Sequence, residues 1–388
     1  MKIIQIYNQQ RSLFSGEETV INSIAEITGI NGHTPKTFMV SSRGIEKSLI
    51  KKIKIFFGAV FNPFSYFRIL KFLKEEKPDI VHFHNIYPLL SPSVFMAVHK
   101  VKVPVVMHVH SQILTCPNWY HLRNSKICEL CLNGREYMCL FTNCRGNIFE
   151  SAAYFLRSYI ADRFRLFKNN VDLFITPSEF LKNRLIDAGF SPEKIECIPN
   201  PLVISGNGSI LQKENYAAYS GRLSYEKGLE VLLTAARENP EIKIKIAGDG
   251  PIRKELEQKA PENVSFIGFL NKPDLADFYK KALFLIIPST CYESFGLSAL
   301  EAMSFGTPVI ASKIGGLPEI VDDNKNGFLF EPGNVPEMSE KMKLLWNNRS
   351  LCSKMGDEAK IKAQPYKDNR IFLEKLMSAY EKAKKNKK

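Results

Sequence analysis

The sequence predicts an α/β protein built from two doubly wound parallel sheets. Short apolar runs alternate with helical patterns along most of the 388 residues, the order expected when each strand of a parallel sheet is followed by a covering helix. The chain is also long for a single hydrophobic core, since domains of about 100–200 residues are usual. The alternation is interrupted near residue 200, which indicates two domains.

The apolar runs divide into two sets of strands at a Pro- and Gly-containing stretch. The expected strands are Lys2–Tyr7, Thr37–Ser41, Asp79–His84, Pro104–His110 and Asp172–Pro177, then Ala217–Gly221, Ile242–Ala247, Val264–Ile267, Leu283–Pro288 and Pro308–Ser312. Ile198–Pro201 and Ser205–Ser209 separate the sets and indicate a linker. We therefore expect one domain over residues 1–200, with a cysteine-rich insert at 116–144, a second over 201–367, and a final helix over 368–388.

A pair of glutamates after one expected strand offers sites for the parts of a nucleotide-sugar. Glu293 and Glu301 follow the apolar run Leu283–Pro288, and a helix is expected to begin near Phe295. The N-terminus of a helix carries unpaired N–H groups and a partial positive charge that suit a diphosphate. Two turns later, Glu301 returns to the same side and offers a carboxylate to sugar or ribose hydroxyls. The alternative interpretation is an ordinary solvated helix face.

A second segment offers cations for the same ligand. Arg222 and Lys227 follow the expected strand Ala217–Gly221 and precede an apolar-periodic helix at Leu229–Ala236. Arg presents a planar fork of donors and Lys a point charge, and both bind diphosphates. They lie at the carboxyl end of a parallel strand, where open α/β sheets bind ligands. Together with the glutamates, they predict an anion-binding site in the second domain.

With these residues in view, the chain resembles the retaining glycosyltransferases of family 4, which have the two-domain GT-B fold. The motifs that carry the resemblance occur in the family's order and are Ser220–Gly228, Ala247–Pro251, Phe266–Phe269, Glu293–Glu301 and Gly306–Ser312. The resemblance covers nearly the whole chain. It implies two Rossmann-like domains whose parallel sheets face each other across a cleft. It also implies sugar transfer from a nucleotide-diphosphate donor to a glycan or lipid-linked glycan acceptor, as in cell-surface polysaccharide biosynthesis.

The resemblance also assigns roles to single residues. It implies that Arg222 and Lys227 hold the donor diphosphate, while Glu293 contacts the transferred sugar. Glu301 is expected to bind the ribose of the nucleoside. The remaining donor contacts that it implies are Gly16 of the first domain and, in the second, Phe295, Gly296 and Leu297 at the phosphates and Gly268, Phe269 and Leu270 at the base. No Asp-x-Asp motif occurs in the sequence, so we expect catalysis without a divalent cation or another cofactor.

Histidines end two expected strands of the first domain. His82 and His84, like His108 and His110, are spaced i and i+2, so both members of each pair face the same side of a strand. This spacing invites a metal hypothesis, although no carboxylate cluster accompanies the pairs. The resemblance instead places His110 near the transferred sugar and puts His84 and Asn85 on the acceptor side. The residue after His110 is Ser, where the family often has Asp, which changes the expected acceptor geometry.

Five of the eight cysteines fall between residues 116 and 144. Cys128 and Cys131 have the Cys-x-x-Cys spacing of a metal knuckle, and Cys144 with Cys116 or Cys139 would complete a tetrahedral thiolate site. Our expected zinc ligands are Cys116, Cys128, Cys131 and Cys144. A structural zinc, unligated thiols and a redox role all stay open, whereas disulfides are not expected in the cytosol. A subset of the family carries a similar insert, with a Cys-Pro pair followed by Cys-x-x-Cys.

The positive charge of the chain is concentrated in its first half. Residues 1–200 hold 25 Lys and Arg against 16 Asp and Glu, a net charge of +9, whereas residues 201–388 hold 28 against 24, a net charge of +4. A basic domain implies an anionic partner, and we expect a lipid diphosphate or an anionic membrane rather than nucleic acid, because no nucleic-acid-binding motif accompanies the charge.

The sequence predicts a cytoplasmic protein, because no signal peptide and no membrane-spanning run is found. Association with the inner face of the membrane stays open. Lys51–Lys77 mixes Lys and Arg with many aromatic residues, as segments at membrane interfaces do, but the same pattern fits two ordinary helices that cover the sheet.

The function that these residues favour is retaining sugar transfer. Arg222, Lys227 and the helix N-terminus would stabilise the charge that develops on the departing diphosphate. Glu293 is then expected to orient the sugar. Two alternatives stay open: a nucleotide-sugar epimerase or phosphorylase on the same fold, and a catalytically silent homologue that acts as a binding or scaffold subunit.

Overall fold

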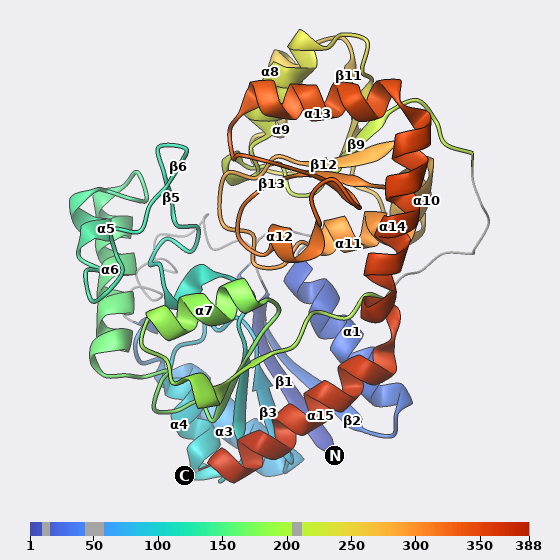
Figure 1. Ribbon diagram of the computed structural model, residues 1–388. Coiled ribbons are helices and arrows are strands. Elements are labelled where there is room, and N and C mark those ends of the chain that lie inside the picture. The colour runs from blue at the N-terminus through green and yellow to red at the C-terminus, as the bar shows by residue number, and fades with distance from the viewer. Residues whose placement is uncertain (10–15, 43–57, 204–211, 388) are drawn as a thin grey trace. The chain divides into compact units, whose positions relative to one another are not determined.

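The computed structural model describes residues 1–9, 16–42, 58–203 and 212–387, and the chain forms two compact α/β units (Figure 1). The first unit contains residues 1–121, 128–199 and 369–388, and the second contains residues 122–127 and 200–368. Of the segments discussed above, residues 51–57 of Lys51–Lys77 and the whole of Ser205–Ser209 lie outside the described residues.

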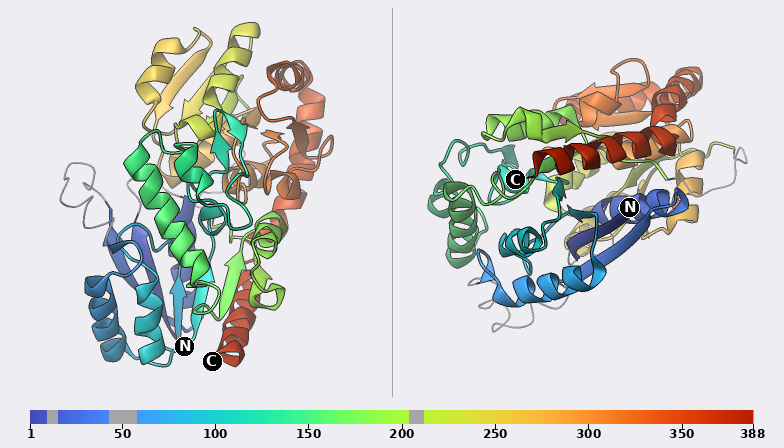
Figure 2. Two further views of the ribbon diagram at one scale, coloured as in Figure 1. Left: turned by 90° about the vertical axis from the view of Figure 1, so that its left-hand side faces the viewer. Right: turned by 90° about the horizontal axis from the view of Figure 1, so that it is seen from below.

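The first unit is built on a six-stranded sheet with the order β2-β1-β3-β4-β7-β8. Its strands are β1 (Lys2–Gln9), β2 (Thr34–Ser41), β3 (Ile80–Phe83), β4 (Val105–His108), β7 (Leu173–Thr176) and β8 (Ile195–Cys197). All neighbours pair in parallel. The inner strands β3, β4 and β7 are buried at every residue, as expected for a parallel sheet with helices on its faces (Figure 2). The helices of this unit are α1 (Gly16–Ile30), α3 (Pro63–Glu76), α4 (Ser93–Lys100), α5 (Met138–Phe141), α6 (Ile148–Arg163), α7 (Glu179–Asp187) and α15 (Asn369–Asn386).

The second unit repeats this layout with the strand order β11-β10-β9-β12-β13-β14, again parallel throughout. Its strands are β9 (Ala217–Ser220), β10 (Ile244–Ala247), β11 (Val264–Gly268), β12 (Phe284–Ile287), β13 (Val309–Ser312) and β14 (Gly327–Phe330). Its helices are α8 (Leu229–Glu238), α9 (Arg253–Lys259), α10 (Lys272–Lys281), α11 (Leu297–Ser304), α12 (Leu317–Ile320), α13 (Val335–Asn347) and α14 (Arg349–Lys367). The two parallel sheets confirm the predicted fold class.

The strands that the sequence predicted are all present. It missed β8 and β14 of the six-stranded sheets and the two short strands β5 (Leu122–Arg123) and β6 (Lys126–Ile127), which pair with each other. β8 is a three-residue edge strand, too short for a periodic signal. β14 begins with Gly327, which follows an Asn and resembles a turn. A Cβ atom at Gly327 would overlap the carbonyl oxygen of Val309 on the neighbouring strand, so the glycine serves a close approach between strands rather than a turn.

The last helix, α15, belongs to the first unit although it ends the chain. It packs against β4 and β7, and the Tyr380 hydroxyl on α15 is hydrogen-bonded to His82 Nδ1 at 2.9 Å. Among the described residues, none of the helices combines the length and the apolar character needed to cross a membrane.

Candidate active site

Two loops at the carboxyl ends of neighbouring strands form the candidate site of the second unit. β9 and β12 are paired in the middle of the sheet, although β10 and β11 lie between them in the sequence. Open α/β sheets bind ligands where the strand order reverses in this way. Arg222 and Lys227 lie in the loop after β9, and Glu293 lies in the loop after β12. The structure therefore brings together the two motifs that the sequence identified.

Lys227 and Glu293 form an ion pair within this site. Lys227 Nζ lies 2.6 Å from Glu293 Oε1, and both side chains are largely buried. The Ser289 hydroxyl donates a further hydrogen bond to the same carboxylate oxygen. Burial opposes the charge on both groups, but the pKa of Lys227 stays above its usual range because of Glu293, and the pKa of Glu293 stays below its usual range because of Lys227. Both groups therefore remain charged at neutral pH.

Glycines at two close backbone approaches fix the position of this ion pair. At Gly228, with φ of 67°, a Cβ atom would overlap the carbonyl oxygen of Pro288. Only glycine lets the two loops approach so closely. At Gly315, with φ of 62°, a Cβ atom would overlap the backbone of Glu293, and the neighbouring Gly316 N–H donates to the Glu293 carbonyl at 2.7 Å. The backbone of Glu293 is thus held by the segment that follows β13.

The N-terminus of α11 lies directly after Glu293, and no side chain caps it. Gly296 at the N-cap has φ of 105°, a conformation that L-residues rarely adopt. The first N–H groups of a helix lack intrahelical partners, and the positive end of its dipole favours an anion. The helix begins at Leu297 rather than near Phe295, whose side chain packs into the core, so only the backbone of Phe295 is available to a phosphate.

Glu301 lies one turn into α11, beside a small hollow of the second unit. The hollow is lined by Val203, Lys272, Leu275, Ala276, Tyr279, Glu301 and Phe305. The Tyr279 hydroxyl donates to Glu301 Oε2 at 3.2 Å and is itself hydrogen-bonded to the Ser220 hydroxyl. Burial raises the pKa of Glu301 to about 7, although the Tyr279 hydrogen bond and Lys272 lower it. Glu301 therefore changes its charge near neutral pH.

Arg222 is exposed on its loop and is positioned through its backbone. The Tyr219 hydroxyl donates to the Arg222 carbonyl at 3.0 Å. A Cβ atom at Gly248, in the turn after β10, would overlap the carbonyl oxygen of Gly221. The turn that contains Gly248 therefore supports the loop that carries Arg222. The exposed guanidinium of Arg222 is accessible to an anion.

The segment expected at the nucleoside base lies at the end of β11. The Gly268 carbonyl accepts a hydrogen bond from the Gly248 N–H at 2.7 Å, which joins this strand end to the turn after β10. Phe269 is exposed and Leu270 is half-buried. The structure thus places Gly268, Phe269 and Leu270 at the carboxyl edge of the same sheet as Arg222, with an exposed aromatic ring among them.

Four histidines of the first unit form a stack at the carboxyl ends of β3 and β4: His82 and His108 lie within the strands, and His84 and His110 follow them. Ring centroids lie 4.5 Å apart for His82 and His84 and 4.2 Å apart for His108 and His110. His82, His84 and His108 are buried, and His110 is half-buried. Burial lowers the pKa of His82, His84 and His110 well below the usual range, and the neighbouring rings lower it further. These three rings are therefore neutral at physiological pH.

A hydrogen-bond chain fixes which ring nitrogens carry protons. Gln5 Nε2 donates to the Ile21 carbonyl at 3.2 Å, so its Oε1 accepts from His84 Nε2 at 2.9 Å. Because His84 is neutral, its Nδ1 carries a lone pair and accepts from His110 Nε2 at 2.8 Å. Neutral His110 then has a lone pair on Nδ1, which forms no hydrogen bond within the described part of the chain. The chain makes His110 Nδ1 an acceptor.

The histidine stack also meets a geometric condition for metal binding. One ring nitrogen from each of His82, His84 and His108 can be chosen so that all three lie within 4.8 Å of one another. Both nitrogens of His84, however, already form hydrogen bonds, and Nδ1 of His82 is bonded to Tyr380. A metal at His84 would have to break one of these bonds. We therefore interpret the four histidines as a hydrogen-bonded network rather than as a metal site.

Asn85 has a local structural role, whereas packing assigns none to Gly16. The Asn85 N–H donates to Glu17 Oε1 at 3.0 Å, and its Oδ1 accepts from the Tyr87 N–H at 3.0 Å. Asn85 thus shapes the loop after β3. Gly16 begins α1, and a Cβ atom there would meet nothing within 4 Å, so packing does not require a glycine at this position.

Several residues of these sites escaped the sequence analysis. Ser289 bonds Glu293, Tyr279 bonds Glu301 and Gln5 orients His84. Each of the three lies in an ordinary strand, loop or helix, so no local pattern marks it. The pair Gly315 and Gly316 did give a signal, because adjacent glycines after a strand indicate a close backbone approach.

Comparison with protein families gives matches that together cover both units. The family described as "Glycosyltransferase Family 4" matches residues 26–205, and the family described as "Glycosyl transferases group 1" matches residues 204–362. An uncharacterised glycosyltransferase of Methanocaldococcus jannaschii is 32% identical over 298 residues, which are 74% of this chain and 71% of that protein. The sulfoquinovosyl transferase of Arabidopsis thaliana is 28% identical over 321 residues, 77% of this chain but only 56% of that protein.

Solved structures give the same fold over the whole chain. Anabaena HepE, crystallised with UDP-glucose, is similar with a TM-score of 0.69 and 20% sequence identity, over 97% of this chain and 100% of that one. At this level of identity, the similarity shows a shared fold.

Proposed function

This chain belongs to the family-4 glycosyltransferases and has the GT-B fold, and from that premise we propose that it is a retaining, metal-independent enzyme that uses a nucleotide-diphosphate sugar. The observation that carries the proposal is the set of groups in the second unit. Glu293 lies in the loop that leads into the uncapped N-terminus of α11 and is paired with Lys227 from the loop after β9, and Glu301 lies one turn into α11. Fixed positive charge and helix N–H groups suit a diphosphate.

In the proposed mechanism, the second unit stabilises the leaving group. Negative charge grows on the diphosphate as the bond to the sugar breaks. Lys227, Arg222 and the N–H groups at Leu297 would offset that charge, the kind of electrostatic contribution that is usually the largest in catalysis. These groups supply the positive charge that a divalent cation supplies in other transferases, and the sequence has no Asp-x-Asp motif to hold one.

Glu293 is proposed to orient the transferred sugar rather than to attack it. Lys227 and Ser289 both bond Glu293 Oε1, so the carboxylate is held in one orientation and its Oε2 can accept a hydrogen bond from a sugar hydroxyl. Retention would then follow from attack by the acceptor hydroxyl on the face from which the diphosphate departs, with a phosphate oxygen taking the proton. His110 is proposed to accept a hydrogen bond from a sugar hydroxyl at Nδ1.

The donor is proposed to be a nucleoside-diphosphate sugar bound through its ribose at Glu301. A carboxylate accepts two hydrogen bonds from adjacent ribose hydroxyls, and the hollow beside Glu301 offers Lys272 and Tyr279 as further polar groups. HepE, which has the same fold, was crystallised with UDP-glucose. UDP-sugars are therefore the first donors to test.

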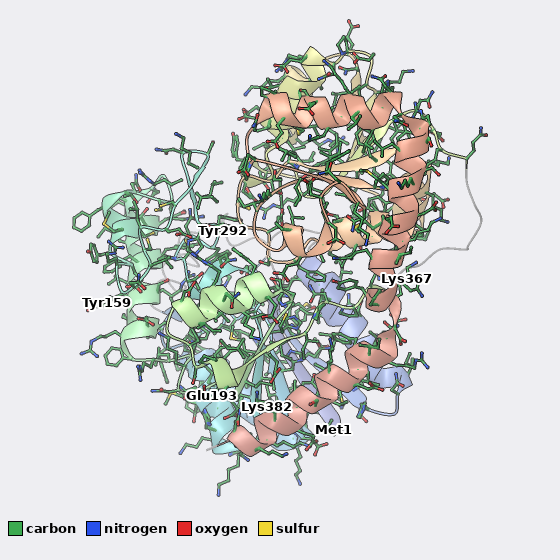
Figure 3. The ribbon with its side chains drawn as sticks, viewed as in Figure 1. Met1, Tyr159, Glu193, Tyr292, Lys367 and Lys382 are labelled. Atoms are coloured by element: carbon green, nitrogen blue, oxygen red, sulfur yellow. The ribbon has the colours of Figure 1, made fainter. Side chains whose placement is uncertain are left out.

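The acceptor is proposed to be a lipid-linked glycan held at an anionic membrane. An exposed apolar face on α6 supports this: Phe149 is 81% exposed and Leu156 39% exposed, seven residues apart on one side of the helix. Tyr159, which points outward from the same helix (Figure 3), is 42% exposed. The helix leads into the exposed Arg163–Arg165, so cations for anionic headgroups adjoin the apolar face.

Binding to lipid vesicles tests the membrane proposal. The protein should bind vesicles that contain anionic lipid at low salt and should release at high salt. Replacing both Phe149 and Leu156 with Ser should weaken binding by about tenfold or more, since each buried apolar side chain contributes about 1.5–3 kcal/mol. Ile361→Ser, at an exposed position of the second unit, is the matched control and should bind as wild type. Equal binding by all three proteins would contradict the proposal.

Sugar transfer itself is tested with a panel of nucleotide sugars, lipid-linked acceptors and EDTA. We expect release of a nucleoside diphosphate that depends on the acceptor and is unaffected by EDTA. The product bond should keep the anomeric configuration of the donor, measured by NMR. Interconversion of donor sugars without an acceptor would favour an epimerase. Absence of turnover with retained donor binding would favour a silent binding subunit.

A further inference from the structure

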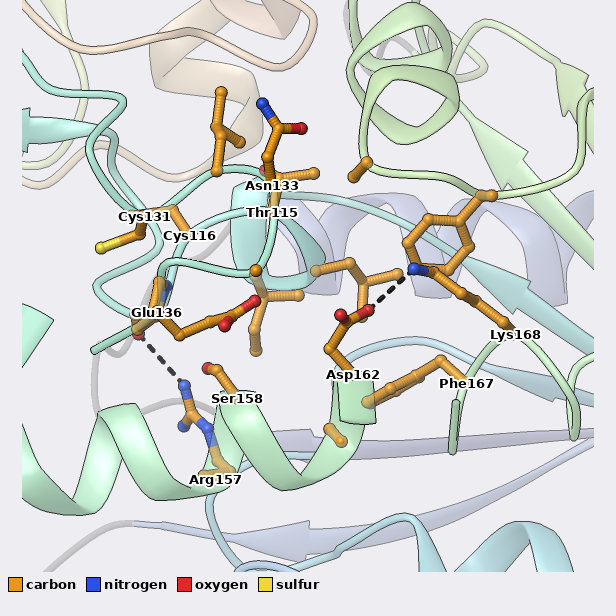
Figure 4. A pocket seen from close by; sticks show the side chains of 18 of the residues that line it. Thr115, Cys116, Cys131, Asn133, Glu136, Arg157, Ser158, Asp162, Phe167 and Lys168 are labelled. Atoms are coloured by element: carbon orange, nitrogen blue, oxygen red, sulfur yellow. Dashed lines mark hydrogen bonds and ion pairs between the residues drawn. The ribbon is translucent and has the colours of Figure 1, made fainter. Parts of the chain in front are cut away.

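A pocket of the first unit lies between the cysteine-rich insert and helix α6 (Figure 4). Its volume, including the space open to solvent, is 710 Å³, and small-molecule sites usually have about 300–1,000 Å³. The insert contributes residues 131–134 and 136, and α6 contributes residues 157, 158, 161 and 162. Tyr87, after β3, and residues 113–117, after β4, also line the pocket. The donor residues discussed above do not reach this pocket, so it needs a ligand of its own.

The insert wall of the pocket is held in place by contacts that need no ligand. Arg184 Nη1 on α7 lies 2.7 Å from Glu129 Oε1 of the insert. Burial lowers the pKa of His121 to about 4, so its ring is neutral at physiological pH. Its Nδ1 donates to the Cys128 carbonyl at 3.1 Å, and its Nε2 accepts from the Thr115 hydroxyl at 2.9 Å. The wall is therefore formed before a ligand binds, which lowers the cost of binding.

A tight turn of the insert directs Glu136 into the pocket. Asn133 and Gly134 have φ of 58° and 77°, the left-handed conformation that Asn and Gly adopt more readily than other residues. After this turn, the half-buried Glu136 side chain extends toward Asp162 on α6 (Figure 4). Among the described residues, no cation forms an ion pair with Glu136, and burial raises the pKa of its carboxyl group. The pocket thus holds a hydrogen-bond acceptor that lacks a partner side chain.

A buried arginine also lines the pocket. Arg157 on α6 is 5% exposed, and its Nη2 donates to the Pro117 carbonyl at 3.1 Å (Figure 4). The central carbon of its guanidinium lies 4.3 Å from the ring centre of Tyr87 and 4.6 Å from that of Tyr154. Attraction to the ring faces offsets part of the cost of burying the charge. Arg157 is therefore held by two rings and by the loop after β4.

The charges on the wall of the pocket balance one another. Lys168 Nζ lies 2.7 Å from Asp162 Oδ1 and 5.0 Å from the ring centre of Phe190. The lining residues therefore include two cations, Arg157 and Lys168, and two carboxylates, Asp162 and Glu136. A diphosphate would meet the carboxylates as well as the cations, and like charges placed together are costly. A neutral ligand with several hydroxyl groups meets only hydrogen-bonding partners.

The pocket adjoins the loops that carry the histidines of the candidate site. Tyr87 lies three residues after His84, and Ile113 lies three residues after His110. Three residues span at most about 11 Å of extended chain. A glycan whose reacting hydroxyl lies at His110 can therefore place a neighbouring sugar unit in the pocket.

We propose that this pocket binds a neutral sugar unit of the glycan acceptor, next to the unit that receives the transferred sugar. The proposal rests on the proposed function, because it takes the acceptor to be a glycan. Glu136 accepts hydrogen bonds from the sugar hydroxyls, and the Ser158 hydroxyl offers a further polar group. Ile113 and Leu114 supply apolar surface for the C–H groups of the sugar ring. The insert thus selects the acceptor, since Glu136 belongs to it.

Saturation-transfer NMR on the purified full chain tests this proposal with methyl glycosides of the common neutral hexoses and N-acetylhexosamines as probes. Wild type should bind at least one of them. Glu136→Gln removes the charged acceptor and Ser158→Leu fills the pocket, so each should weaken that binding about tenfold or more. Glu179→Gln, at an exposed carboxylate on α7 of the same unit, is the matched control and should bind as wild type.

Methyl-labelled spectra of wild type locate the bound glycoside. Its addition should shift the methyl signals of Ile113, Leu114 and Leu132, which line the pocket, and leave Ile361 of the second unit unchanged. Absence of binding by every glycoside, or equal binding by wild type, Glu136→Gln and Ser158→Leu, would overturn the proposal. Tighter binding of glucose 1-phosphate than of methyl glucoside would also overturn it, because the pocket would then prefer an anion.

Calorimetry with UDP-glucose and the other nucleotide sugars separates this proposal from the proposed function. Glu136→Gln should bind the donor as wild type does, because Glu136 lies in the first unit. Wild type that binds a nucleotide sugar but no glycoside would overturn the pocket proposal alone. Wild type that binds a glycoside in the pocket but no nucleotide sugar would support a sugar site there and contradict the proposed function.

Discussion

The candidate sites of the two units differ in their electrostatics. In the second unit, the site is made of charges: an ion pair at 2.6 Å between Lys227 and Glu293, with the exposed Arg222 on the same loop as the lysine. In the first unit, the corresponding strand ends carry a stack of histidines, and burial keeps His82, His84 and His110 neutral. Both sites follow the same parallel-sheet layout, so the fold alone does not set this difference.

The difference teaches what each unit can do chemically. A diphosphate needs fixed positive charge, which the second unit holds at neutral pH by pairing each buried group with an opposite charge. A sugar hydroxyl needs a neutral acceptor or donor in a defined orientation, which the first unit provides through the chain from Gln5 to His84 to His110. The comparison predicts that substitutions that remove a charge lower activity most in the second unit. Substitutions that change the tautomer of a histidine should lower activity most in the first unit.

Replacing Lys227 should give the largest effect. Lys227→Ala removes a cation from the proposed diphosphate site and leaves Glu293 largely buried without its partner, so we expect kcat to fall about 10²–10³-fold. The free energy of unfolding should fall by about 1–3 kcal/mol, less than for a fully buried pair because both side chains are partly exposed. Activity assays and urea denaturation measure the two effects.

Lys245→Ala is the matched control for Lys227→Ala. It breaks an ion pair of similar length, 3.1 Å to Glu214, but on the exposed surface of the second unit. Exposed pairs contribute little, so its kcat should match wild type. If Lys245→Ala lowers kcat as much as Lys227→Ala does, the loss of activity does not come from the charge at the candidate site.

Replacing Gln5 should have an intermediate effect on activity, and this effect should arise from a change in the tautomer of His84 and His110. Gln5→Met removes the acceptor that holds the proton on His84 Nε2 and should lower kcat/KM about tenfold, the effect of one lost hydrogen bond. Ring ¹⁵N shifts in NMR spectra should show His110 changing from the single Nε2–H form to a mixture. Unchanged ¹⁵N shifts in Gln5→Met would contradict the hydrogen-bond chain.

Titration of Glu301 should give the smallest effect, visible as pH dependence. Its pKa of about 7 in the folded protein without nucleotide means that it is protonated below and ionised above that pH. Only the carboxylate accepts two hydrogen bonds from a ribose, so the affinity for nucleotide should rise between pH 6 and pH 8. In this range, binding of the nucleotide should release a proton from Glu301. Calorimetry in buffers of different ionisation enthalpy measures that proton. Glu301→Gln should bind more weakly and without this pH dependence.

The sequence predicted the strands and both donor loops, because these rest on local signals. The strand before Ser220 and the strand before Pro288 are unbroken apolar runs, and glycines such as Gly228 and Gly296 mark the turns after them. Those signals placed Lys227 and Glu293 on loops, and parallel-sheet topology brought the loops together.

Contacts between distant residues were not predictable in the same way. Nothing near Gln5 indicates that it orients His84, because their hydrogen bond joins residues 79 positions apart. The cysteines show the same limit. The Cys-x-x-Cys spacing of Cys128 and Cys131 is a local signal for a metal site, whereas the three possible ligands that lie within 4.8 Å of one another among the described residues are His82, His84 and His108.

Calorimetric titration of UDP-, GDP-, ADP- and dTDP-sugars into wild type and Lys227→Ala, with and without EDTA, tests the central claim that the second unit holds a nucleotide-diphosphate sugar by fixed protein charge. The account predicts that sugars of one nucleotide class bind wild type, that EDTA leaves their affinity unchanged, and that Lys227→Ala weakens it about tenfold or more. Binding that requires a divalent cation, or that is equally strong in Lys227→Ala, would contradict it.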